Sequence, residues 1–117
     1  MSPEFPQPMK TIIEAFRQAA IRTGVQDPAT FNRWAARVRA CYKLLRRTKE
    51  GREAIISLVG DPNVHVRFWA ASYALQWVPG IARAALEKIR DSEGWDLSFT
   101  AEITLKEFDK GTLSFDC

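Results

Sequence analysis

The side chains that most often carry out enzymatic chemistry are scarce in this sequence. His65 is the one histidine of the chain, and it falls in the first turn of a predicted helix. A single imidazole without an identifiable partner assembles neither a Ser/His/Asp set nor a Cys/His set. We therefore interpret His65 as a surface residue of a capping turn rather than as a catalytic base.

Metal and cofactor sites also lack their usual sequence patterns. The six glycines are scattered at predicted helix ends, without the spacing of a P-loop or a dinucleotide fingerprint. Cys41 lies in an apolar helical stripe and Cys117 is the last residue, so the two cysteines form neither a zinc motif nor a disulfide framework. We expect no catalytic residue, no metal site and no cofactor.

Two pairs of carboxylates have a spacing that suits acid–base chemistry. Glu87 and Asp91 stand one helical turn apart, and Glu93 and Asp96 are close in sequence. Carboxylates at an exposed helix end are more often solvated than catalytic. An enzyme therefore ranks last among the function classes, and we expect the protein not to be one.

Charge is distributed unevenly along the chain. The formal net charge is +3, but residues 28–52 contain eight basic residues and one acid, Glu50. Four of the basic residues lie opposite the apolar stripe of the same predicted helix, and we call them the basic stripe: Arg33, Arg37, Lys43 and Arg47. The basic stripe is either a solvated outer face or a binding surface for an acidic protein or a nucleic acid.

Most aromatic residues fall at core spacing. For Trp34, Trp69 and Trp77, packing is favoured over a ligand cage. Trp95 stands in the segment SEGWD, which predicts a loop, and it has no helical stripe to join. We interpret Trp95 either as a lid on the last helix pair or as an exposed anchor for a partner. Nucleic-acid binders usually stack bases on exposed aromatics, so a nucleic acid is the less favoured partner.

Helical periodicity dominates the chain, and no stretch alternates like a β-strand bounded by hairpin turns. The pattern predicts an all-α fold of about six helices, at about 9–23, 28–47, 52–59, 64–77, 79–90 and 98–110, with a break at 48–51. Asp27 and Asn63 are predicted N-caps. Short helices joined by tight turns predict stacked antiparallel pairs, an α–α superhelix rather than a four-helix bundle.

The fourth predicted helix is apolar on two opposite sides, so other helices must enclose it. We expect Trp69, Ala70 and Tyr73 to be buried there. On neighbouring helices, Phe31 and Ile81 are predicted to face inward because they share the apolar spacing.

The length fits one domain over residues 9–117. The opening MSPEF resembles a cloning scar, so we expect residues 1–8 to be disordered or vector-derived. No apolar run is long enough for a membrane span, and the N-terminus lacks a signal-peptide pattern. We expect a cytoplasmic protein without membrane association.

The segment LVGDPNVHVRFWAASYAL resembles a HEAT repeat, with its Asp-Pro turn and the Val-Arg that opens the next helix. Together with FNRW, VPGIARAALEKI and LSFTAEITLKEFDKGTL, it resembles the bacterial family DUF2019, a domain of unknown function, over roughly residues 10–113. This resemblance implies a small HEAT-like or armadillo-like helical fold. It also implies that Asp61 and Arg67 form hydrogen bonds between turns and helix starts, which is a structural role. We expect Trp69 and Tyr73 to be structural as well, through packing in the core.

We expect a non-enzymatic protein-interaction module. The specific version is a bacterial immunity protein that neutralises a toxin by direct binding, an expectation that rests on analogy of fold. The basic stripe and Trp95 are the expected contacts with the partner, whose surface would be acidic. The alternative is a helical repeat that binds nucleic acid through the basic face of the second helix.

Overall fold

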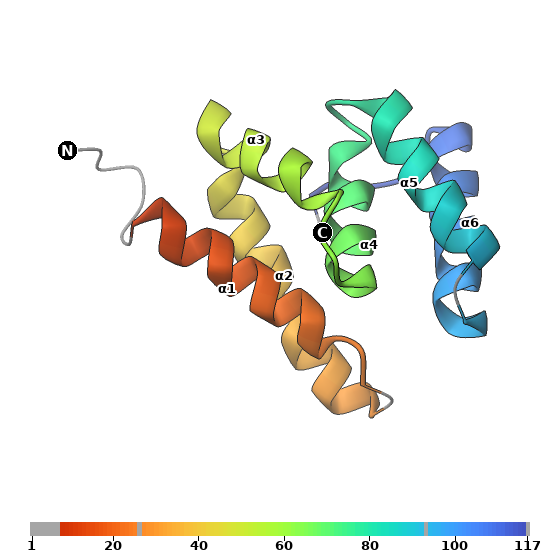
Figure 1. Ribbon diagram of the computed structural model, residues 1–117, viewed down its shortest axis with the longest axis horizontal. Coiled ribbons are helices and arrows are strands. Elements are labelled where there is room, and N and C mark those ends of the chain that lie inside the picture. Colours follow the sequence, from red (N-terminus) through yellow and green to blue (C-terminus); the bar gives the residue numbers. More distant parts are fainter. Residues whose placement is uncertain (1–7, 26, 93, 117) are drawn as a thin grey trace.

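The computed structural model describes residues 8–25, 27–92 and 94–116, apart from the side chain of Trp95. These residues form six α-helices and no strand, as the sequence predicts (Figure 1). The helices are α1 (Met9–Arg22), α2 (Pro28–Leu45), α3 (Lys49–Leu58), α4 (Val64–Ala74), α5 (Pro79–Ser92) and α6 (Trp95–Lys110). The sequence predicts residues 1–8 to be disordered or vector-derived, and all of these residues except Pro8 lie outside the described part of the chain.

Helices that follow one another in the chain also pack against one another. The pairs α1 with α2, α3 with α4 and α5 with α6 are in contact, and α4 also packs against α5 and α1. Figure 1 shows α1 and α2 side by side at one end, α4 in the middle, and α5 and α6 together at the other end. The result is an elongated body of 44 × 31 × 26 Å.

Side-chain caps determine where several helices begin. Asp27 accepts a hydrogen bond from the Thr30 backbone N–H at 2.9 Å, and Pro28 opens α2. The Asn63 side chain accepts two backbone hydrogen bonds in the first turn of α4, from His65 and Val66. These contacts satisfy donors that the first turn of a helix leaves unpaired.

Two helices begin earlier than the sequence predicts. Thr48 caps α3 by accepting from the Gly51 N–H at 3.0 Å, so Gly51 lies inside the helix rather than in a break. A side chain there would not fit, because a Cβ on Gly51 would stand 1.9 Å from the carbonyl oxygen of Leu45. At the other end, α6 begins at Trp95 and not at residue 98, so Trp95 is helical and the predicted loop is shorter.

The core forms along α4, where Ala70, Ala71 and Ala74 are fully buried. Tyr73 is also buried, and its ring stacks on the ring of Tyr42 with centroids 3.7 Å apart. Small alanines at this position let neighbouring helices approach closely, and the stacked tyrosines fill the space between α2 and α4.

Three apolar residues are more exposed than the sequence predicts. Phe31 is 39% exposed and Ile81 is 61% exposed, each in the first turn of its helix and next to an exposed connection. Trp69 is only partly buried, because one side of α4 is not covered by a helix. That side of α4 is where the candidate site lies.

No helix in the described parts of the chain combines the length and the apolar character that crossing a membrane requires.

Candidate functional site

A groove runs along the uncovered side of α4, between α2 and α6. Two cavities form it, of about 280 and 270 Å³, and they share four lining residues: Phe31, Phe68, Trp69 and Thr100. Because the cavities share these residues, they lie next to one another, and we call the two together, as two halves, the central groove. Its floor is aromatic and comes from α4, and its walls come from α2 and α6.

The first half of the central groove is closed by the α1–α2 turn. His65 and Asp96 line this half together with Gly24. The imidazole packs directly on the turn, since a Cβ on Gly24 would stand 2.6 Å from Nε2 of His65. His65 thus belongs to the capped first turn of α4, as the sequence predicts, and its partly exposed side chain lies in the groove wall.

Trp69 is held in the groove floor by a hydrogen bond to the α1–α2 turn. Its indole N–H donates to Thr23 Oγ1 at 3.0 Å, and the Thr23 hydroxyl in turn donates to the carbonyl oxygen of Ala20 at 2.6 Å. Thr23 is buried, so its hydroxyl is committed to these two partners. The indole is thereby fixed at one angle, with its exposed face forming part of the groove.

The second half of the central groove is closed by the chain's own C-terminal segment. Leu113, Ser114 and Phe115 line this half beside Arg39 of α2 and Thr104 of α6. Figure 1 shows this last segment, in blue, leaving α6 and running past α4. A segment remote in sequence therefore covers part of the face that no helix covers.

Arg46, just after α2, joins the C-terminal segment to the helices. Its NH1 group donates to the carbonyl oxygen of Phe115 at 3.2 Å and pairs with Asp116 Oδ1 at 2.7 Å. The guanidinium also lies over the ring of Tyr42, 5.2 Å from its centroid. The hydroxyl of Tyr42 accepts from Gln76 of the α4–α5 connection at 2.8 Å, which steadies the ring beneath the arginine.

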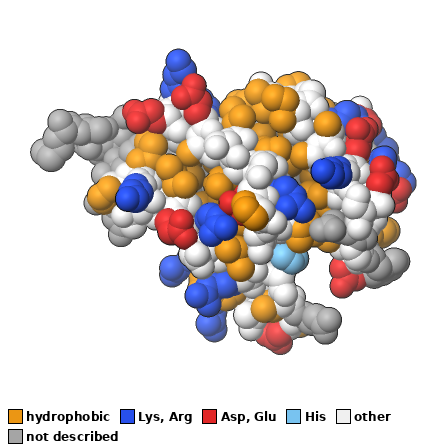
Figure 2. All heavy atoms as spheres, viewed as in Figure 1, with side chains coloured by type: hydrophobic (Ala, Val, Ile, Leu, Met, Phe, Trp, Pro, Cys, Tyr) orange, Lys and Arg blue, Asp and Glu red, His pale blue; other side chains and the backbone are white. Residues whose placement is uncertain are grey.

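The basic stripe lies on another side of α2. Its four residues are exposed, whereas Arg39 lines the central groove. The guanidinium of Arg37 is 5.7 Å from the ring centroid of Trp34, so one member of the stripe rests on an aromatic face. Figure 2 shows Lys and Arg side chains gathered at the lower edge of the view, over α1 and α2.

The side chain of Trp95 lies outside the described part of the structure, so neither of the two interpretations given for it is tested.

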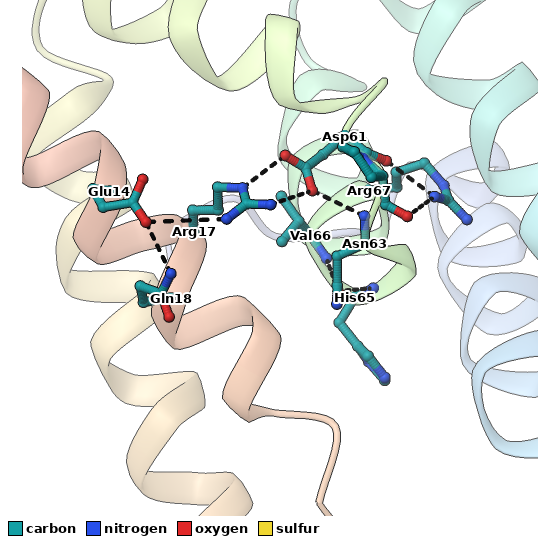
Figure 3. A network of polar contacts seen from close by, with 9 residues as sticks. Glu14, Arg17, Gln18, Asp61, Asn63, His65, Val66 and Arg67 are labelled. Atoms are coloured by element: carbon teal, nitrogen blue, oxygen red, sulfur yellow. Dashed lines mark hydrogen bonds and ion pairs between the residues drawn. The ribbon is translucent and has the colours of Figure 1, made fainter.

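Asp61, in the α3–α4 turn, is the centre of a polar network (Figure 3). Arg17 of α1 donates to it from Nε at 2.8 Å and from NH2 at 3.3 Å, and the Asn63 backbone N–H donates at 2.9 Å. Arg67 turns the other way and donates to the carbonyl oxygens of Asp61 and Pro62 at 3.0 and 2.9 Å. Asp61 and Arg67 thus hold the same turn from its two sides.

Burial alone would raise the pKa of Asp61, but the hydrogen bonds from Arg17 and from the Asn63 N–H, with the charges of Arg17 and Arg67, lower it overall. The carboxyl group therefore stays ionised beside α1. In Figure 3 the ring of His65 points away from this network, so the imidazole and Asp61 do not form a catalytic pair.

Two further kinds of chemical site are a cluster of metal ligands and a reactive thiol. Among the described residues, no group of three or more His, Cys, Asp or Glu side chains could hold a metal ion. Burial raises the pKa of Cys41, which keeps the thiol neutral and a poor nucleophile. The lining of the groove is an aromatic floor with Arg39 beside it.

Sequence reasoning missed the central groove, Arg39 and Arg46. One signal was present: the two arginines are seven residues apart, so they lie on one side of α2, beside its apolar stripe. The role of residues 113–116 carried no local signal, because their contacts are with residues about 70 positions away.

Comparisons with known proteins place the fold and the family. No curated protein matches the chain. A crystal structure of the protein RPA1889 from Rhodopseudomonas palustris CGA009 is similar, with a TM-score of 0.82 and 25% sequence identity. The match covers 97% of this chain and 98% of that one. The family model of a domain of unknown function, DUF2019, matches residues 14–109, and the chain therefore belongs to the DUF2019 family.

Proposed function

We propose that the protein is a non-enzymatic interaction module that binds a protein partner in the central groove. The observation that carries the proposal is the groove itself, which has a floor of Phe68 and Trp69 and an exposed Phe31 at its edge. Arg39 also lines the groove. Exposed apolar surface in a depression with an arginine beside it is typical of protein interfaces, where aromatic and arginine side chains contribute most of the binding energy.

The order of the helices supports this proposal. The second helix of each consecutive pair, α2, α4 and α6, contributes to the same groove. HEAT-like and armadillo-like proteins also stack helix pairs, and they bind partners along the resulting concave surface. This likeness and the DPNVHVR motif support our proposal that the protein is of that structural class.

Charge supports an acidic partner. The basic stripe is exposed on α2, next to the side of the helix that lines the groove. A partner seated in the groove with acidic residues at its margin would therefore be attracted to α2, which favours rapid and selective association. In this proposal the basic stripe guides the partner, the groove anchors it, and Trp95 at the start of α6 adds a contact.

Toxin neutralisation in the bacterial cytoplasm is the cellular role that we propose within this class. It rests on analogy with small helical immunity proteins, which block a toxin by covering its surface. The test is growth of cells that express a toxin encoded beside the gene for this chain. Wild-type protein should restore growth, and a folded variant with a blocked groove should not.

Binding in the groove is tested with a random peptide library displayed on phage. Peptides that bind the wild-type protein should lose at least about tenfold in affinity for Phe31→Asp, which puts a charge at the groove's edge. The matched control is Ile81→Asp, another exposed apolar residue in a first helical turn, and it should bind as wild type does. Equal binding by the two variants, or the absence of any enriched peptide, would contradict the proposal.

Nucleic-acid binding remains the second candidate, favoured by one observation. The four cations of the basic stripe are exposed along one helix, which suits a row of phosphates. Such binding would be steeply dependent on salt and would not require the Phe31 ring, so it is separable from groove binding.

A further inference from the structure

The C-terminal segment occupies the central groove in the way that a bound peptide would. Gly111, with a φ of 75°, ends α6 and turns the chain back. The Gly111 and Thr112 N–H groups donate to the carbonyl oxygens of Phe108 and Glu107, which close the turn. Residues 112–116 then form no helix or strand, and they lie beside α4 and α2.

Alternate side chains anchor this segment. Leu113 and Phe115 pack against the core, and Ser114 between them is exposed. In an extended chain, residues two apart point the same way, so two apolar anchors separated by one residue suit a groove that opens on one side. The carboxylate of Asp116 then meets Arg46, so the segment ends on an ion pair.

Apart from the packing of Leu113 and Phe115, few interactions bind this segment to the helices. The hydrogen bonds that join residues 113–116 to the helices, within the described chain, both come from Arg46. The side chain of Asp116 is 82% exposed, and exposed ion pairs contribute little to stability. A better-fitting segment could therefore take the place of this one.

The central groove also contains recognition groups that the C-terminal segment does not use. Arg39 lines the groove and makes no hydrogen bond or ion pair with any described residue. The half of the groove at His65 and Leu97 is lined by other parts of the chain, without a contribution from residues 113–115. A longer ligand would reach this half, and a carboxylate on the ligand would meet Arg39 in the other half.

We propose that residues 112–116 are a resident ligand of the central groove, and that the partner binds by replacing them. The replacing segment is extended and carries two large apolar side chains separated by one residue, followed by a carboxylate. This inference rests on the proposed function, because it names the chemistry of the partner that the groove receives. It also makes the C-terminal segment a built-in competitor, present at a high effective concentration because it is tethered.

The test uses the full chain and a fluorescent peptide of residues 111–116, GTLSFD, with fluorescence anisotropy as the readout. The variant Leu113→Gly/Phe115→Gly removes both anchors, so its groove is open. It should bind the peptide at least about tenfold more tightly than wild type, because the tethered competitor is gone. A control peptide with serine at the leucine and phenylalanine positions should not bind.

Two further variants connect binding to the groove. In the open-groove background, Arg46→Glu should weaken peptide binding by about tenfold, because the carboxylate loses its partner and meets a like charge. Lys10→Glu makes the same change of charge at an exposed position of α1 that lines neither half of the groove, and it should leave affinity within about twofold. If Arg46→Glu and Lys10→Glu weakened binding equally, general charge attraction would explain the result and the inference would be wrong.

A milder variant serves as the control for loss of folding. Asp116→Lys changes an exposed side chain and leaves both anchors in place, so circular dichroism should be that of wild type. It should raise peptide affinity by about two- to fivefold, since the segment loses its ion pair. If neither Asp116→Lys nor the folded open-groove variant gains affinity over wild type, the inference is overturned. If peptides from the phage library still bind wild type more tightly than Phe31→Asp, the proposed function would remain supported although this inference is wrong.

Discussion

Arg17 and Asp61 form a two-point ion pair across 44 residues of sequence, with Nε to Oδ1 at 2.8 Å and NH2 to Oδ2 at 3.3 Å (Figure 3). The pair fastens α1 to the α3–α4 turn, and the Asp61 side chain is only 8% exposed. Through that turn, α1 is connected to the start of α4, the helix that forms the groove floor. The pair is therefore part of what keeps the two halves of the molecule aligned.

Asp61→Ala should lower the free energy of unfolding by about 2 kcal/mol, because it leaves a backbone N–H and a partly buried guanidinium without their acceptor. Urea denaturation of the two proteins measures the change. The control is Asp109→Ala, which breaks an ion pair between Arg83 and an exposed aspartate. That change should cost less than about 1 kcal/mol. Equal costs would show that the Asp61 network adds nothing beyond a surface pair.

The contribution of Asp61 should depend on pH. Its pKa is lowered in the folded protein, so the stabilisation is present above the ordinary aspartate value of about 3.9. It is lost as the pH falls through the lowered folded-state value. The gap in unfolding free energy between wild type and Asp61→Ala should therefore be widest near neutrality and shrink below about pH 4. A gap that stays constant from pH 7 to pH 3 would contradict this assignment.

The sequence predicts the number and order of the helices because caps and apolar periodicity are local. Asp27 and Asn63 cap their helices as predicted. The sequence predicts the start of α3 wrongly, because it suggests a break at 48–51, whereas Gly51 is inside the helix. Its real role is a close approach to the Leu45 carbonyl, and only the packing of the α2–α3 connection reveals it.

Gly51→Ala should destabilise the protein by about 3 kcal/mol or more, because the new Cβ would overlap a backbone carbonyl that cannot move without distorting the connection. Gly80→Ala is the matched control, since Gly80 is also helical and nothing lies within 4 Å of its added Cβ. That variant should be neutral or more stable by up to about 1 kcal/mol. Thermal unfolding followed by circular dichroism compares the two.

The candidate site was less predictable than the fold, because it depends on contacts between distant residues. The helical periodicity of the sequence puts Trp69 in an apolar stripe of α4, but periodicity does not reveal that no helix covers this side. The same periodicity predicts the basic stripe, and Arg39 and Arg46 differ from that stripe only by their angle around α2. Their roles follow from Phe115 and Asp116, about 70 residues later, and no local pattern encodes that distance.

Trp69→Ala should lower the unfolding free energy by about 3 kcal/mol, at the low end for a tryptophan because the ring is only partly buried. Thr23→Val keeps the indole and removes the hydroxyl, with its hydrogen bonds to the indole N–H and to the Ala20 carbonyl, so it should cost about 2 kcal/mol. The two variants separate packing from hydrogen bonding, and urea denaturation measures both. An unchanged midpoint for Trp69→Ala would show that α4 is not central to the fold.

Reversal of the basic stripe distinguishes the two function classes. Replacing its four residues by Glu takes the formal net charge from +3 to −5, two units for each residue. The apolar stripe of α2 is unchanged, so circular dichroism should show a folded protein.

If the partner is a protein, groove-binding peptides should still bind this variant, with a slower association rate because the attraction to α2 is lost. If the partner is a nucleic acid, wild type should bind unrelated DNA duplexes alike, and its affinity should fall by about one power of ten per decade of salt for each phosphate contacted. The variant should then lose all binding to DNA. A third outcome is that the variant binds the peptides as fast as wild type does, and that wild type does not bind DNA. The basic stripe would then be a solvated face, and the central groove would be the binding surface.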